Sequence, residues 1–132
     1  QSVWPVRVYY EDTDAGGVVY YANYLRFCER ARTERLRACG VNQRELLATQ
    51  GIAFMVRRVE ANYLKGAELD DELQVVTTVA SVGAASLVFQ QSILRGAERL
   101  FEASITIACV DMQRRRATRI PDALRSLFES EA

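Results

Sequence analysis

The order of apolar and polar residues predicts one long helix near the start of the chain and a group of strands after it. Along Val3 to Tyr10 apolar and polar side chains alternate, the period of a strand with one buried face. From about Ala22 to Arg37 apolar residues recur every three or four positions, as in an amphipathic helix, and Gly40 is a stop signal. A shorter helix is predicted over Gln43 to Thr49, ended by Gly51.

Four more strands are predicted beyond the second helix, followed by a closing helix that Pro121 opens. The strands cover Phe54 to Leu64, Glu72 to Ser81, Ser86 to Arg95 and Leu100 to Asp111, and the helix covers Asp122 to Glu129. The turn signals between the strands are spaced as in an antiparallel meander. One long helix beside about five strands predicts an α+β fold in which the sheet wraps around the helix and buries it. Residues 1–132 contain no linker and are predicted to form one domain.

Charge and composition exclude several classes of partner. The chain has 17 Lys and Arg against 17 Asp and Glu, so no global field favours nucleic acid or a membrane surface. No apolar run approaches the roughly 20 residues of a membrane span. The three cysteines, Cys28, Cys39 and Cys109, fit neither a disulfide framework nor a metal knuckle, and Gln1 to Val8 does not resemble a signal peptide. These features favour a cytoplasmic protein.

The chain contains no histidine, and this excludes most familiar catalytic devices. Ser-His-Asp and Cys-His nucleophiles, histidine bases and the common zinc sites are not available within one chain. Lys65 is the single lysine, so a Schiff base would have to form there. Catalysis has to depend on carboxylates, backbone dipoles, Tyr, Lys or Cys, and neither a metal nor a cofactor is predicted.

The segment from Glu11 to Gly17 carries the candidate chemistry, because it places three acids and two adjacent glycines between a strand and a helix start. Glycine allows a backbone conformation that brings the chain close to a ligand, and the helix start directs N–H groups toward the loop. Such groups stabilise negative charge on a carbonyl oxygen. From the residues alone, an Asp in such a loop is more often a turn former than a catalyst. Glu11 and Asp12 are interpreted as solvated loop acids, and a role in supporting the site is the alternative for both.

The same segment resembles a known motif, D-x-D-x-x-G-x-V-x-[YH]-x-N-Y. It stands here as Asp12-Thr13-Asp14-Ala15-Gly16-Gly17-Val18-Val19-Tyr20-Tyr21-Ala22-Asn23-Tyr24, with every named position matched. The motif is that of the hotdog-fold acyl-CoA thioesterases of the tol-pal-associated and 4-hydroxybenzoyl-CoA type. The resemblance continues through Glu29 to Glu34 and the later strands, covers nearly the whole chain, and is closest to the tol-pal-associated branch.

The resemblance implies roles for particular residues. Asp14 falls on the catalytic carboxylate, as nucleophile or general base, and the backbone amide of Tyr21 on the group that polarises the thioester carbonyl. Tyr21 stands where the tol-pal-associated branch often has His, a change that affects the acyl pocket rather than the amide. The predicted substrate-binding residues are Gly17, Val18, Asn23, Tyr24 and Arg58.

Two of these assignments have alternatives. Asn23 and Tyr24 could equally serve to start and pack the helix. The phosphates of coenzyme A need basic partners, and Arg57, Lys65 and the run Arg114 to Arg116 are candidates beside Arg58.

The resemblance also implies hydrolysis of acyl-CoA or acyl carrier protein thioesters by homodimers or homotetramers with sites at subunit interfaces. A hotdog dehydratase is disfavoured because those relatives use a catalytic histidine. A non-catalytic subunit that binds acyl-CoA or acyl carrier protein near the cell envelope is the alternative function. The intact Asp14 and the glycine pair favour the enzyme.

Overall fold

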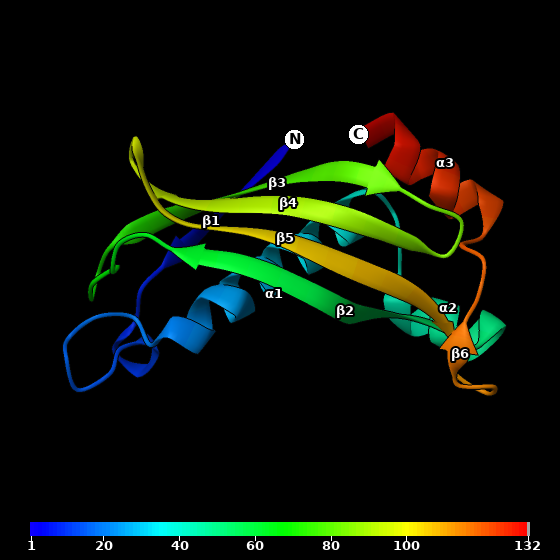
Figure 1. Ribbon diagram of the computed structural model, residues 1–132, viewed down its shortest axis with the longest axis horizontal. Helices are drawn as coiled ribbons and strands as arrows, with labels where there is room; N and C mark the ends of the chain where they lie inside the picture. The colour runs from blue at the N-terminus through cyan, green and yellow to red at the C-terminus, as the bar shows by residue number, and fades with distance from the viewer. Residues whose placement is uncertain (132) are drawn as a thin grey trace.

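The computed structural model describes residues 1–131 and shows a curled antiparallel sheet with one long helix on its concave face (Figure 1). The helices are η1 (Tyr10–Asp12), α1 (Tyr21–Ala38), α2 (Gln43–Gln50) and α3 (Asp122–Glu131). The strands are β1 (Ser2–Arg7), β2 (Ile52–Tyr63), β3 (Glu72–Val82), β4 (Ser86–Arg95), β5 (Glu98–Asp111) and β6 (Arg116–Ala117). The predicted α+β fold, with about five strands wrapped around one helix, is confirmed, and β6 is a short addition that pairs with the end of β5.

The order of strands in the sheet is β1-β3-β4-β5-β2, so the predicted meander is right only for β3, β4 and β5. β2 does not pair with β3, which follows it in the chain. It pairs with β5, from Ile52 opposite Asp111 to Tyr63 opposite Phe101. The segment after β2 is therefore a crossover rather than a hairpin turn, and it leaves β1 and β2 as the two edges of the sheet.

The first strand ends at Arg7, earlier than its alternating pattern predicted. Tyr9 and Tyr10 continue the alternation in sequence but are 61% and 82% exposed, because the chain turns into η1 there. The Asp12 carboxylate stabilises this turn by accepting a hydrogen bond from the Tyr9 amide at 2.9 Å. Alternation alone does not distinguish a strand from a short turn that follows it.

Helix α1 packs against β1 and β3 through its apolar stripe, of which Phe27 and Cys28 are fully buried. Facing residues of the sheet, such as Leu73 and Val75, are equally buried. Burying a side chain of this size contributes about 1.5–3 kcal/mol. This packing fixes the position of the start of the helix, where the predicted site lies.

Strand β2 is exposed along its middle, in contrast to the strands beside it. Met55 and Val56 are about half exposed, and Val59 is 39% exposed. Within residues 1–131 no strand pairs with its outer edge. A long apolar edge of this kind is a template for pairing with another chain. No helix in the described part of the chain is long and apolar enough to cross a membrane.

Candidate active site

Asp14 lies on a tight turn between η1 and α1. The Gly17 amide donates to the Asp14 carbonyl at 3.0 Å and closes a four-residue turn, for which Asp at the first position and Gly at the last are favoured. Gly17 has a φ of 81°, a conformation that favours glycine. The Asp14 amide in turn donates to the Val18 carbonyl at 2.9 Å. The local sequence therefore specifies the turn without help from distant residues.

The Asp14 side chain is exposed, and one hydrogen bond orients it. Its Oδ1 accepts from the Gly16 amide at 2.8 Å, while no hydrogen bond or ion pair involves its Oδ2 among residues 1–131. A Cβ at position 16 would lie 3.2 Å from Oδ1, so the glycine lets the backbone approach the carboxylate. One carboxylate oxygen is held and the other faces solvent.

The turn is anchored to the segment between β2 and β3. The Val19 amide donates to the Ala67 carbonyl at 2.8 Å, and Val18 forms a bridge with Glu68. A Cβ at Gly66 would lie 3.2 Å from the Val18 side chain, so this contact requires a small residue at position 66. The segment after β2 thus fixes the position of Val18 and Val19, directly after Gly17 in the chain.

Helix α1 begins at Tyr21, directly after the turn, and no side chain caps its first amides. The first amides of a helix have no carbonyl partner within the helix and carry its positive dipole end. The Tyr21 side chain is 61% exposed. The structure therefore places an uncapped helix start beside the loop that carries Asp14.

Asp12 is not the solvated loop acid that the sequence suggested. It is only 7% exposed, and its Oδ1 accepts from the Asn23 side-chain amide at 3.0 Å. A buried carboxylate requires such hydrogen bonds to offset its lost hydration. The signal for this role was the motif itself, which contains both residues. Glu11, in contrast, is exposed as expected.

Tyr24 is buried in a group of aromatic rings beneath the helix start. Its ring stacks on Phe101 at 5.3 Å between centroids, and its hydroxyl accepts from the Ala67 amide at 2.9 Å. Tyr63, at the end of β2, contacts both Tyr24 and the exposed Tyr21, with centroids 5.8 and 6.0 Å apart. Asn23 and Tyr24 therefore hold the helix start in place, and their contact with substrate stays a prediction.

Comparisons with known proteins assign the chain to a family. A family model described as the Thioesterase-like superfamily matches residues 8–128. The chain belongs to this superfamily. An acyl-CoA thioesterase YbgC from Haemophilus influenzae is 46% identical over 125 residues, which are 95% of this chain and 92% of that protein. An acyl-CoA thioester hydrolase YbgC from Escherichia coli O6:H1 is 45% identical over 96% of this chain and 94% of that one.

The solved structures give the same result. A probable thioesterase from Bartonella henselae superposes with a TM-score of 0.86 at 36% identity, over 91% of this chain and 98% of that one. The predicted family, the hotdog fold and the assignment as a thioester hydrolase are confirmed.

Arg58 of this thioesterase lies in the middle of β2, at a shift in the pairing with β5. Its side chain is 71% exposed and forms an ion pair with Glu60 on the same strand. No hydrogen bond or ion pair within the described residues joins it to the Asp14 loop. Lys65 is likewise paired, with Glu98 at 2.6 Å. The binding of coenzyme A phosphates by Arg58 stays a prediction.

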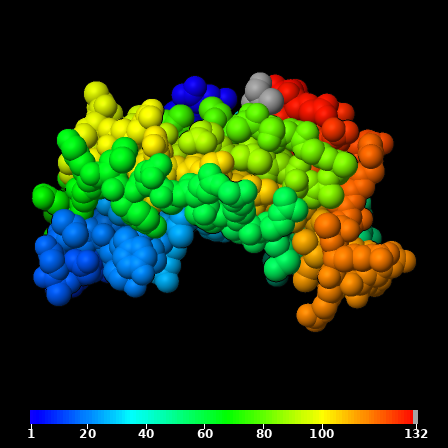
Figure 2. All heavy atoms as spheres, in the orientation of Figure 1, coloured from blue at the N-terminus to red at the C-terminus, as the bar shows by residue number. Residues whose placement is uncertain are grey.

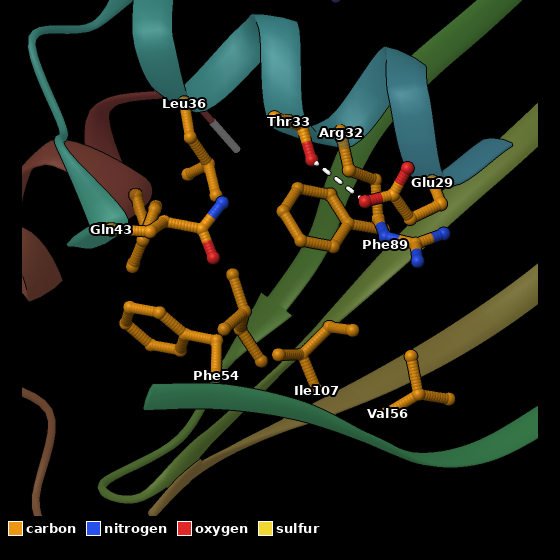
Figure 3. A pocket seen from close by; sticks show the side chains of 11 residues that line it. Glu29, Arg32, Thr33, Leu36, Gln43, Phe54, Val56, Phe89 and Ile107 are labelled. Carbon is orange, nitrogen blue, oxygen red and sulfur yellow. Dashed lines mark hydrogen bonds between the residues drawn. The ribbon is translucent and has the colours of Figure 1, made fainter. Parts of the chain in front are cut away.

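The thioesterase also has an apolar pocket under the C-terminal half of α1, away from the Asp14 loop (Figure 3). Its walls include Phe54, Phe89 and Ile107 from the sheet. Glu29, Arg32 and Thr33 line its polar part, where the Thr33 hydroxyl donates to the Glu29 carboxylate at 3.2 Å.

Sequence reasoning missed Tyr63 and Gly66 as neighbours of the site. In the sequence, Tyr63 was one residue of a predicted strand, and nothing in the pattern placed it near the start of the helix. Gly66 lay in a turn segment whose partner could not be inferred, because its contact with Val18 spans 48 residues of sequence.

Proposed function

We propose that this protein hydrolyses acyl-CoA thioesters to the free acid and coenzyme A. The observation that carries the proposal is an exposed carboxylate, Asp14, held on a rigid turn beside an uncapped helix start in a chain without histidine. Relatives that are 45–46% identical over most of their length are named acyl-CoA thioesterases or thioester hydrolases, which supports this substrate class.

In the proposed reaction the Tyr21 amide donates a hydrogen bond to the thioester oxygen, where negative charge develops. Asp14 either attacks the carbonyl carbon to give a mixed anhydride, which water then hydrolyses, or accepts a proton from the attacking water. In both routes the C–S bond breaks and coenzyme A leaves as a thiolate. Since a thiol has a pKa of about 8.5, the leaving group needs no strong general acid.

We further propose that the active unit is a homodimer joined along β2. The unpaired outer edge of this strand and its exposed apolar residues Met55, Val56 and Val59 support this assembly. Pairing of the dimers into tetramers, location in the cytoplasm and an association with the cell envelope stay predictions from sequence.

The test is thiol release from short, medium, long and aromatic acyl-CoAs by the wild type and by Asp14→Asn. We expect the variant to bind acyl-CoA but to lose on the order of 100-fold or more in kcat. Glu11→Gln is the matched control, because it neutralises an exposed acid of the same loop. Wild-type turnover in Asp14→Asn would exclude Asp14 as the reacting carboxylate.

The same panel separates the alternatives. If no acyl-CoA is hydrolysed, acyl carrier protein thioesters are the next substrates to measure. A protein that binds both kinds of thioester without hydrolysing either is the non-catalytic subunit.

A further inference from the structure

The crossover segment, residues 65–68 between β2 and β3, lies against the loop of residues 9–20 that carries Asp14. In Figure 2 the segment, in green, meets the loop, in blue, at one end of the molecule. Val18 forms a bridge with Glu68, and the Val19 amide donates to the Ala67 carbonyl at 2.8 Å. The crossover segment belongs to no helix or named strand, so other groups have to hold it in place.

The position of the crossover segment affects both groups of the proposed reaction. The Val18 carbonyl accepts a hydrogen bond from the Asp14 amide at 2.9 Å. Val19 is two residues before Tyr21, whose amide polarises the thioester carbonyl in the proposed reaction. A shift of residues 18–19 therefore changes the separation between the carboxylate and that amide.

The Tyr24 side chain connects helix α1 to the crossover segment. Its hydroxyl accepts from the Ala67 amide at 2.9 Å and donates to the Lys65 carbonyl at 3.4 Å. These bonds span 43 and 41 residues of sequence. Tyr24 is only 3% exposed, so removing its hydroxyl would leave the buried Ala67 amide without its acceptor.

Neighbouring aromatic rings fix the Tyr24 ring. It stacks on Phe101 with 5.3 Å between centroids and 7° between the ring planes. Phe27 and Tyr63 approach it edge-on, with centroids 6.4 and 5.8 Å away. Because this packing fixes the ring in the first turn of α1, the hydroxyl relates the position of the helix to that of the crossover segment.

The end of the crossover segment next to β3 has an anchor of its own. The Asp71 carboxylate accepts from the Glu68 amide at 2.8 Å and forms an ion pair with Arg95 at 2.7 Å. This anchor stays in place when the Tyr24 hydroxyl is lost. Loss of the hydroxyl therefore displaces the part around Ala67 locally and does not release the whole segment.

We propose that the Tyr24 hydroxyl is a positioning group for the reaction. Through the Ala67 amide it holds residues 18–19 in the place that sets Asp14 against the Tyr21 amide. The inference rests on the proposed hydrolysis. It gives Tyr24 a role that needs no contact with the thioester, and it accounts for a hydroxyl at a ring that is otherwise enclosed by aromatic neighbours.

The first test is the kinetics of Tyr24→Phe, which keeps the ring and removes the hydroxyl. We expect kcat to fall on the order of tenfold or more with little change in KM, because a small misplacement of the reacting groups slows the chemical step. Both proteins are measured at a temperature at which each is fully folded.

Thr77→Val is the control for a loss of stability alone. Thr77 is fully buried on β3, and its hydroxyl accepts from Gln91 at 2.9 Å, so this variant also removes one buried hydrogen bond. It should lower the free energy of unfolding by a similar amount and leave kcat unchanged.

Gly66→Ala tests the same contact from the other side. The new Cβ would lie 3.2 Å from the Val18 side chain and displace it without a change in α1. This variant should also lower kcat more than it raises KM. Gly83→Ala is its matched control, because its Cβ would lie 3.2 Å from the Ser86 carbonyl oxygen in the turn between β3 and β4.

Hydrogen exchange followed by NMR tests the positions of the backbone without a substrate. The amides of Ala67 and Val19 should exchange faster in Tyr24→Phe than in the wild type. The Val8 amide, which donates to the Asp71 carbonyl at 2.9 Å, should keep its rate.

Three results would overturn the inference: a Tyr24→Phe variant that keeps the kcat of an active wild type, equal kcat losses in Tyr24→Phe and Thr77→Val, or unchanged exchange at Ala67 and Val19. A wild type that releases no thiol from any acyl-CoA overturns the proposed function instead. The exchange rates then still decide whether the hydroxyl holds the loop, so the two failures are distinct.

Discussion

The side-chain amide of Asn23 donates to Oδ1 of Asp12 across 3.0 Å, and both residues are buried. The other oxygen of Asp12 accepts from the Tyr9 amide. One carboxylate thus ties the chain after β1 to the first turn of α1. The turn that carries Asp14 lies between these two points, so this buried pair positions the candidate catalytic carboxylate without contacting it.

Asn23→Ala should destabilise the protein and slow the reaction. It leaves a buried carboxylate oxygen without its donor, which costs about 1–3 kcal/mol in the free energy of unfolding. Urea denaturation of Asn23→Ala and wild type measures this cost. In the kinetics of the variant, kcat should fall by a larger factor than KM rises. Asn62→Ala is the control, because Asn62 makes a similar bond to Glu102 in an exposed position. Equal losses in the two variants would contradict the positioning role.

Replacing each of the two glycines of the turn by alanine should have a different main effect, on stability for Gly17 and on kcat for Gly16. Gly17→Ala should cost about 1–2 kcal/mol of stability, because its φ of 81° is unfavourable for alanine. Gly16→Ala should mainly lower kcat, since the new Cβ would lie 3.2 Å from the Asp14 carboxylate and displace it. Gly96→Ala, at a φ of 61° in a remote turn, should match the first variant in stability and leave kcat unchanged. An unaltered kcat in Gly16→Ala would show that the orientation of Asp14 is not critical.

The buried network around Gln91 should be sensitive to the loss of a single member. Gln91 accepts from Arg32 at 2.9 Å and donates to the Cys28 carbonyl and the Thr77 hydroxyl. Gln91→Met should cost about 3 kcal/mol or more in unfolding free energy, because the Arg32 guanidinium stays buried without its acceptor. Gln90→Met, on the exposed neighbour, should have little effect.

The same network offers a second test. Arg32→Met combined with Gln91→Met should recover part of the loss, because the double variant leaves no buried charge in this network. A double variant that is less stable than Gln91→Met alone would contradict this account.

Glu98 should contribute a pH-dependent part of the stability. A hydrogen bond from Lys65, and a smaller contribution from Arg95, hold the pKa of the Glu98 carboxyl below the ordinary value of 4.5. Because the folded pKa is the lower one, the contribution is present above 4.5 and is lost as the pH falls through the folded pKa. The stabilities of wild type and Glu98→Gln should therefore differ at neutral pH and converge as the pH falls below the folded pKa. A constant difference across this range would exclude the carboxylate as its source.

Cys28 should not react with thiol reagents in the folded protein. Burial raises the pKa of its thiol to about 12, although the nearby Arg32 opposes the shift, so almost no thiolate forms at neutral pH. The rate at which a thiol reagent labels Cys28 is measured by mass spectrometry at about pH 8, with and without guanidinium. Modification of Cys28 as fast as that of an unfolded control would contradict the buried environment.

The local elements could be predicted because each depends on neighbours in sequence. The apolar stripe of α1, the glycine that ends α2 and the turn of Asp14 to Gly17 are all encoded within a few residues. The motif added the family and, through it, the candidate carboxylate. The partners of these elements were not predictable in the same way. The polar loop around Asp12 gave no sign that this residue is buried, and the motif that contains both Asp12 and Asn23 was the one signal for their bond.

The sequence by itself determined the α+β class, the long helix and the strands, because periodicity and turn residues are local properties. The absence of histidine is a property of composition, and it limited the predicted chemistry to carboxylates, backbone dipoles, Tyr, Lys or Cys. Only the tertiary structure decided that β2 pairs with β5 and forms an open edge, and that Tyr63 lies against Tyr21. It also decided that the Asp14 loop and the turn between β5 and β6 stand at opposite ends of that edge (Figure 2). The periodicity of a strand reports which face is buried, but the strand beside it is chosen by the packing of the whole sheet.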